Sequence, residues 1–212
     1  MLQGLYAIID EGVLIGEDLV RVAQDYLEGG IKIIQYRHKH RHESTQSYQK
    51  YLQRAEAIGA LRSQYAFTYI INDDLDAFQK VGADGIHVGK DDFSIEECRK
   101  QVGSKIIGYS SHSLAEALEA EKRGPDYVAF GAIFPTTTKG PGHPIQSVEK
   151  LKVVVESLKV PVVAIGGIGR DNVQDVVETG VAMVAMISAL GRPQSKNRVT
   201  EARYFVDIIN KR

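Results

Sequence analysis

Charged side chains suited to phosphate chemistry follow short apolar runs in several parts of the sequence. Arg37, Lys39 and Lys139 are cationic, and Asp73 and Asp92 are acidic. Two carboxylates can hold Mg²⁺ together with water and substrate oxygens, and nearby cations can take the remaining phosphate charge. The combination suits a pyrophosphate group. The alternative is that each Asp only caps the helix that follows it.

A second candidate anion site lies in the last third of the chain. Gly166 and Gly167 follow an apolar run, and Ser188 follows the next one. Glycines let the backbone approach a phosphate closely, and backbone amides near a helix start bind the anion. A plain tight turn between a strand and a helix is the alternative. Two anion sites in one protein would indicate two phosphorylated substrates.

The elements that must position these residues alternate between two periods. Apolar runs rich in β-branched and aromatic residues occur eight times, at 5–9, 31–36, 67–71, 85–88, 106–109, 127–131, 162–165 and 182–187. A segment with helical spacing follows each run, and Ser94 and Ser113 both begin a predicted capping box. Eight strand–helix units without a linker predict an α/β fold, a single (β/α)8 TIM barrel over residues 1–212. A doubly wound open sheet is the alternative, but no Gly-rich fingerprint follows the first run.

The barrel prediction explains where the polar residues stand. In this fold the chemistry lies at the carboxyl ends of the strands. The candidate residues all follow the predicted strands, whereas the turns at 124–125 and 160–161, at the opposite end, carry nothing comparable. Asp73 and Asp92 come from adjacent units, so we expect both to face the surface at one mouth of the barrel.

Composition narrows the classes of function. The 26 Lys and Arg nearly balance the 27 Asp and Glu, so the net charge of −1 argues against nucleic acid or an anionic membrane as partner. Cys98 is the one cysteine, which excludes a disulfide framework and a Cys-based zinc site. No run approaches the ~20 apolar residues of a membrane span, and the start of the chain lacks a signal-peptide layout. We expect a soluble, cytoplasmic protein, and the sequence leaves open whether it forms a homo-oligomer.

Six short segments, in order along the chain, carry a resemblance to a known family. They are Gln35-Tyr36-Arg37-His38-Lys39, Ile71-Asn72-Asp73-Asp74, Gly82-Ala83-Asp84-Gly85-Ile86-His87-Val88-Gly89 running on to Asp92, Gly108-Tyr109-Ser110-Ser111-His112, Pro135-Thr136-Thr137-Thr138-Lys139 and Ala164-Ile165-Gly166-Gly167-Ile168. Over nearly its whole length the chain resembles the thiamine-phosphate synthases. The resemblance is specific because all six segments fall on the expected strands and loops.

The resemblance implies a reaction and a set of residue roles. A hydroxymethylpyrimidine pyrophosphate, 4-amino-2-methyl-5-(diphosphomethyl)pyrimidine, would be joined to a thiazole phosphate with loss of pyrophosphate, with Mg²⁺ as cofactor. The implied residues are Gln35, Arg37, Lys39, Asn72 and Ser110 for the pyrimidine pyrophosphate, Asp73 and Asp92 for Mg²⁺, Lys139 for the leaving pyrophosphate, and Thr136, Thr138, Gly167, Ile187 and Ser188 for the thiazole phosphate. Among them Arg37, Ser110 and Lys139 would be catalytic.

The implied chemistry suits these side chains. An aminopyrimidine can stabilise a methylene cation, so ionisation needs mainly a stabilised leaving group and good positioning. A nucleophilic Ser or Cys is not required. Some positions depart from the common family pattern, among them Lys90 where Gln is usual and Asp74 where Arg is frequent.

Two other functions remain as alternatives. Thiazole tautomerases resemble this fold and use a His at a position like that of His112 for proton transfer. They typically lack the Asn-Asp pair and the later metal-binding Asp, both of which this chain has as Asn72, Asp73 and Asp92. The other alternative is a non-catalytic barrel that binds a phosphate ligand. His87, on the fourth predicted strand, is expected to be a packed or hydrogen-bonded barrel residue.

Overall fold

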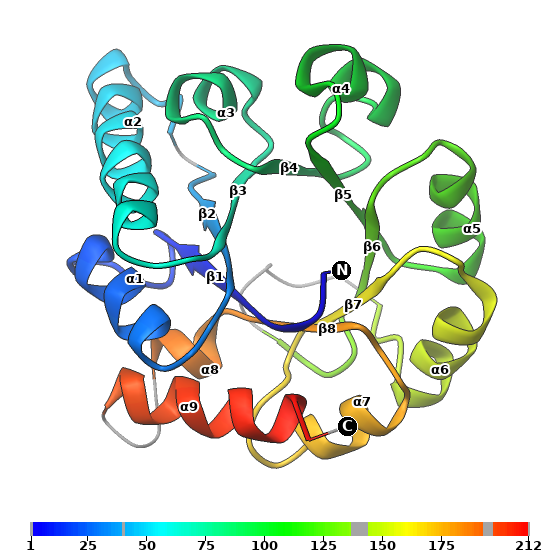
Figure 1. The fold of residues 1–212 in the computed structure, drawn as a ribbon. Helices are drawn as coiled ribbons and strands as arrows, with labels where there is room; N and C mark the ends of the chain where they lie inside the picture. Colours follow the sequence, from blue (N-terminus) through cyan, green and yellow to red (C-terminus); the bar gives the residue numbers. More distant parts are fainter. Residues whose placement is uncertain (1, 40, 137–143, 193–196, 212) are drawn as a thin grey trace.

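Eight parallel strands close into a barrel in the computed structural model, which describes residues 2–39, 41–136, 144–192 and 197–211 (Figure 1). Each strand pairs with its neighbours in chain order, and β8 closes the barrel against β1. The strands are β1 (Gly4–Asp10), β2 (Ile33–Arg37), β3 (Thr68–Asn72), β4 (Gly85–Val88), β5 (Ile106–Ser111), β6 (Tyr127–Gly131), β7 (Val162–Ile165) and β8 (Met183–Met186). The predicted TIM barrel is confirmed, and every predicted run overlaps its strand.

Helices surround the barrel as an outer ring (Figure 1). They are α1 (Leu19–Glu28), α2 (Thr45–Ala60) with the short 3₁₀ turn η1 (Leu61–Ser63), α3 (Leu75–Val81), α4 (Ile95–Val102), α5 (Leu114–Lys122), α6 (Val148–Ser157), α7 (Val173–Glu178), α8 (Ser188–Gly191) and α9 (Arg198–Ile209). The last of these, α9, packs against α1 and α7 and so completes the ring. The helices cover the outer face of every strand.

The capping residues start the helices where the sequence predicts. Ser94 and Glu97 form the complete predicted capping box at the start of α4. Ser113 caps α5, but the Glu116 carboxylate accepts a hydrogen bond from the backbone of His112 instead of Ser113. The predicted capping box of α5 is therefore only half formed, since the Ser113 side chain caps the helix but the Glu116 side chain does not bond to the backbone of Ser113. Cys98, on α4, is fully buried, and burial raises the pKa of its thiol to about 11.

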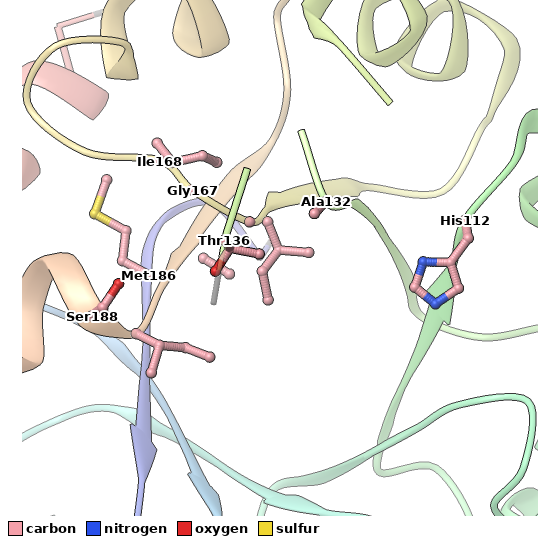
Figure 2. A pocket seen from close by; sticks show the side chains of 11 residues that line it. His112, Ala132, Thr136, Gly167, Ile168, Met186 and Ser188 are labelled. Atoms are coloured by element: carbon pink, nitrogen blue, oxygen red, sulfur yellow. The ribbon is translucent and has the colours of Figure 1, made fainter. Parts of the chain in front are cut away.

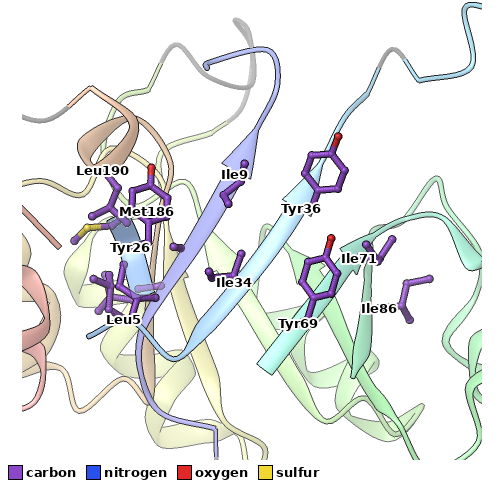
Figure 3. Packing of buried hydrophobic residues seen from close by; sticks show 14 of the residues in the cluster. Leu5, Ile9, Tyr26, Ile34, Tyr36, Tyr69, Ile71, Ile86, Met186 and Leu190 are labelled. Atoms are coloured by element: carbon purple, nitrogen blue, oxygen red, sulfur yellow. The ribbon is translucent and has the colours of Figure 1, made fainter. Parts of the chain in front are cut away.

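Alternate residues of each strand point to opposite sides, which gives the barrel two cores. The inner core fills the barrel and consists of Tyr6, Ile8, Ile33, Ile70, Tyr127, Ala129, Val163, Met183 and Ala185. The outer core lies between strands and helices, and Figure 3 shows part of it, with Ile9, Tyr36 and Tyr69 on their strands. Toward the carboxyl ends of the strands, the inward positions change from apolar to polar residues: Asp10, Arg37, Asn72, His87 and Ser110.

Close strand contacts inside the barrel require glycine at Gly85 on β4. A methyl group there would lie 2.6 Å from Ile106 Cβ and 2.7 Å from the Ile106 carbonyl oxygen. We expect Gly85→Ala to lower the free energy of unfolding by about 1–3 kcal/mol through overpacking. Urea denaturation of Gly169→Ala is the matched control, because nothing lies within 4 Å of a methyl group at Gly169. Equal stability of the two variants would contradict this account of the barrel interior.

Candidate active site

A polar hollow of about 780 Å³ opens at the carboxyl ends of β2 to β5. Its lining joins residues from four strand ends and from the length of α5. Predicted site residues that line it are Arg37, Lys39, Asn72, Asp92 and Ser110. Arg37, Lys39, Asn72 and Ser110, which are expected to bind the pyrimidine pyrophosphate, therefore lie together at the carboxyl ends of the strands.

Lysine and arginine at this mouth are held by carboxylates. Arg37, at the end of β2, forms an ion pair with Asp10, which is buried at the end of β1. Lys39 forms an ion pair with Asp73, and its Nζ also lies 3.9 Å from Asp92 Oδ1. Lys39 thus lies between the two carboxylates that the family resemblance assigns to a metal ion.

The expectation that Asp73 faces the surface is wrong. Only 7% of Asp73 is exposed, and its backbone has a φ of +45°, in the left-handed region that Asp tolerates better than most residues. The turn directs the carboxylate inward, where Asn72 Nδ2 donates a hydrogen bond of 2.5 Å to Asp73 Oδ2. Asp92 is exposed as expected.

Neither predicted metal ligand, Asp73 or Asp92, caps the helix that follows it. Asp74 caps α3 in place of Asp73, accepting a hydrogen bond of 2.9 Å from the backbone of Ala77. Asp92 Oδ2 accepts from the backbone N–H of Gly89 at 2.8 Å, which stabilises the turn after β4. The other oxygen, Oδ1, faces Lys39. Both Asp73 and Asp92 therefore keep an oxygen directed toward the same ammonium group.

Arg41 is an important residue of this site that the sequence reasoning missed. It is buried, pairs with Asp73, and donates from Nε to Asp74 Oδ2 at 2.8 Å. Its Nη1 also donates to the backbone oxygen of His38 at 2.9 Å. Arg41 therefore joins the loop after β2 to the loop after β3. The sequence signal that could have indicated Arg41 is Asp74, because two adjacent carboxylates, Asp73 and Asp74, repel each other unless a cation lies nearby.

These cations decide the charge of Asp73. Burial alone would raise the pKa of this carboxyl, but the hydrogen bond from Lys39 and the positive charge of Arg41 outweigh it. The net result is a pKa below the ordinary value. Asp73 is consequently ionised at neutral pH.

Gln35 and Ser110 belong to a chain of hydrogen bonds that runs through the barrel. Gln35 Nε2 donates to the hydroxyl of Tyr6 at 2.7 Å, and Ser110 Oγ lies 2.8 Å from His87 Nε2. The prediction that His87 is a hydrogen-bonded barrel residue is confirmed. Asp10 was missed because the sequence argument examined strand ends only from the second strand onward, and Tyr6 was missed because it lies in the middle of β1, where a tyrosine is indistinguishable from an ordinary core residue.

A second, more apolar hollow lies at the ends of β6 to β8. Figure 2 shows His112 on one side of it and Gly167, Met186 and Ser188 on the other, with Thr136 and Ile187 also in the lining. Gly167 has a φ of +66°, and a methyl group there would lie 2.5 Å from the carbonyl oxygen of Pro135. The turn therefore requires glycine, and its backbone lines the hollow directly.

The two hollows are neighbours. His112 lines both, and its Nδ1 lies 2.7 Å from the carbonyl oxygen of Gly131. Thr138 and Lys139 lie outside the described residues. The remaining predicted site residues fall into the two hollows or, for Gln35 and Asp73, directly beside the polar one.

The donor set suits a divalent cation bound together with a substrate. Within the described ranges, no group of three or more His, Cys, Asp or Glu is placed to hold a metal. Mg²⁺ needs only one or two carboxylates when water and phosphate oxygens complete its octahedron. Asp73 and Asp92 fit that requirement.

Fold and site together define a TIM-barrel enzyme of the phosphate-binding kind. The sequence model described as thiamine monophosphate synthase matches residues 5–190. The chain belongs to this family. None of the helices in the described part of the chain is long and apolar enough to cross a membrane.

Individual relatives agree with the family. The chain is 41% identical to a thiamine-phosphate synthase of Shouchella clausii over 88% of this chain and 87% of that protein. It is 37% identical to one of Clostridium acetobutylicum over 98% and 95% of the two chains. The solved thiamine phosphate pyrophosphorylase of Pyrococcus furiosus superposes with a TM-score of 0.87 at 34% identity, covering 99% of this chain and 96% of that one. The predicted family and its enzyme class, a transferase, are confirmed, and neither alternative function is favoured.

Substitution of Arg41 should show how much this residue contributes to the free energy of unfolding. Arg41→Ala would remove the arginine from two buried carboxylates and leave Asp73 with Lys39 as its cation, so we expect a loss of about 3 kcal/mol in the free energy of unfolding at pH 7. Because the folded pKa of Asp73 is lowered, its ionic stabilisation is present above about pH 4 and lost as the pH falls through the folded value. The difference between parent and variant should therefore shrink in acid.

Denaturation at several pH values, by circular dichroism, measures this difference. Lys122→Ala is the control, since Lys122 makes an exposed ion pair of 3.1 Å with Glu119. Exposed pairs of this kind contribute little. A loss for Arg41→Ala that is as small as the control's, or independent of pH, would contradict the role assigned to Arg41.

Proposed function

We propose that this chain couples hydroxymethylpyrimidine pyrophosphate to a thiazole phosphate and releases pyrophosphate. The observation that carries the proposal is the position of Lys39 between Asp73 and Asp92, at the rim of the polar hollow. One ammonium and two carboxylates at one point suit a pyrophosphate and its metal ion. As the eight strands form one closed barrel, we also propose that residues 1–212 form a single domain.

The leaving group would be stabilised by charges on neighbouring strands. Mg²⁺, held by Asp73 and Asp92, would neutralise the pyrophosphate as its carbon–oxygen bond breaks. Asp10 fixes the Arg37 guanidinium, whose further N–H groups would bind phosphate oxygens. Lys39 would bind the same pyrophosphate, and Lys139 would join it from the loop after β6.

The pyrimidine would lie over the inward residues of β2, β3 and β5. Gln35, Asn72 and Ser110 supply hydrogen-bonding groups there, and all three already belong to buried or half-buried networks. Such fixed groups orient the ring so that its methylene carbon faces the second substrate. The electron pair of the broken bond would leave with the pyrophosphate.

The thiazole phosphate would occupy the neighbouring apolar hollow. The turn at Gly167, together with Thr136, Thr138 and Ser188, would bind its phosphate, and Ile187 would contact the ring. Its ring nitrogen would then capture the methylene cation and form the new carbon–nitrogen bond. The adjacency of the two hollows at His112 supports this arrangement.

The metal assignment predicts a difference between two adjacent residues. Asp92→Asn should lower turnover by orders of magnitude at limiting Mg²⁺ and raise the Mg²⁺ concentration needed for half-maximal rate, because a charged ligand is lost. Asp91→Asn is the matched control, since Asp91 lines the same hollow but makes no ion pair with Lys39 among the described contacts. Mg²⁺ titration of the pyrophosphate-release rate measures both. Similar Mg²⁺ curves for the two variants would argue against Asp92 as a ligand.

The reaction class is tested with His112. A tautomerase needs a general acid–base group that contributes about 10²–10⁴-fold, whereas a synthase depends on ionising a carbon–oxygen bond. We expect the parent to release pyrophosphate from both substrates with Mg²⁺, and His112→Asn to keep most of that activity while Asp73→Asn loses it. A parent that makes no pyrophosphate but isomerises a thiazole carboxylate phosphate, in a His112-dependent way, would refute the proposal.

A further inference from the structure

Five polar side chains form a continuous hydrogen-bond chain across the interior of the barrel. It runs from Gln35 on β2 through Tyr6 on β1, Tyr127 on β6 and His87 on β4 to Ser110 on β5. Tyr6 and Tyr127 are each only 1% exposed, while Ser110 lines the polar hollow. The chain therefore passes through the closed interior at the two tyrosines and reaches the polar hollow at Ser110.

With Gln35 Nε2 as the donor to Tyr6, the remaining donors and acceptors follow one direction along this chain. Gln35 Nε2 donates to the Tyr6 hydroxyl at 2.7 Å, so the single proton of Tyr6 remains for Tyr127, whose hydroxyl lies at 2.8 Å. Tyr127 then donates its own proton to His87 Nδ1, at 3.0 Å. The opposite direction would leave the Tyr6 proton facing the Gln35 amide N–H, a buried donor without an acceptor in this chain.

This direction sets the protonation of His87 and the orientation of Ser110. A neutral imidazole that accepts at Nδ1 carries its proton on Nε2 and donates from there. Nε2 lies 2.8 Å from Ser110 Oγ, so the serine oxygen accepts from His87. The hydroxyl proton of Ser110 is left to donate into the hollow.

The surroundings hold the two phenols in place and in their protonated form. The rings of His87 and Tyr127 stack at 5.6 Å between centroids with an interplanar angle of 19°. A methyl group at Gly108 would overlap the ring of Tyr127, so glycine on β5 makes the room that the phenol occupies. Burial raises the pKa of Tyr6 and of Tyr127 well above the ordinary value, and both remain proton donors at any physiological pH.

We propose that Tyr6, Tyr127 and His87 are positioning residues that fix Ser110 as a hydrogen-bond donor toward a ring acceptor of the pyrimidine substrate. The inference rests on the proposed function for the identity of the substrate. The direction of the chain does not depend on it. Tyr127 acts only through His87 and Ser110 and has no contact with substrate in this scheme.

The first measurement is the tautomer of His87 in the parent protein. Long-range ¹H–¹⁵N correlation spectra of histidine-labelled protein show which ring nitrogen carries the proton, and the signal of His87 is the one lost in His87→Gln. We expect a neutral ring with the proton on Nε2. A proton on Nδ1, or a doubly protonated ring at neutral pH, would overturn the proposal without any substitution at Tyr127.

The second measurement breaks the chain at Tyr127. Tyr127→Phe removes the donor to Nδ1, so we expect a mixture of His87 tautomers and a rise of about five- to tenfold in KM for the pyrimidine pyrophosphate, the effect of one lost hydrogen bond. The KM for the thiazole phosphate should stay unchanged. Unaltered tautomer and KM in a folded variant would contradict the proposal.

Tyr69→Phe is the matched control. Tyr69 is equally buried, and its hydroxyl donates to the Ala55 carbonyl oxygen at 2.9 Å on the outer side of the barrel. We expect it to change neither the His87 signal nor either KM. A parent that releases no pyrophosphate would refute the proposed function alone, because the tautomer is read without substrate.

Discussion

Neutralisation of one buried carboxylate organises the polar mouth of this barrel. Asp73 is almost excluded from water, and a buried charge is strongly destabilising unless cations and hydrogen-bond donors surround it. Arg41 and Lys39 reach it from the loop after β2, and Asn72 adds a donor from β3. Because these partners come from two units, the pairing fixes one loop against the other. The position of Lys39 beside Asp92 follows from that arrangement.

Local pattern was enough to predict the barrel and most strand limits. The runs at 85–88, 127–131 and 162–165 coincide with β4, β6 and β7, since these strands are covered on both faces and, apart from His87 in β4, consist of apolar residues and glycine. The carboxyl ends of β2 and β3 each lie one residue beyond the predicted run, because the polar residues Arg37 and Asn72 continue the strands into the mouth. The rule that chemistry follows strand ends predicted that the candidate residues lie at one mouth, and five of them line the polar hollow there.

Contacts between distant segments could not be read from the sequence. The burial of Asp73 depends on Arg41, 32 positions away, and on a left-handed backbone conformation that the residue types at this turn do not predict. The pair of hydroxyls on Tyr6 and Tyr127 joins residues 121 positions apart. Tyrosine on an apolar strand reads as ordinary core, and only the closed barrel shows that both phenols point to the same interior.

The fit between Gly108 and Tyr127 has a consequence for how such a barrel can evolve. The two residues are direct neighbours across β5 and β6, and the large ring occupies the volume that the glycine leaves free. Enlarging the first without reducing the second creates a collision, and reducing the second alone leaves a void. Divergence at these positions therefore proceeds by compensating changes, with a less stable protein as the intermediate. The effect of a substitution at Gly108 therefore depends on the residue at position 127, and the reverse, which is a case of epistasis.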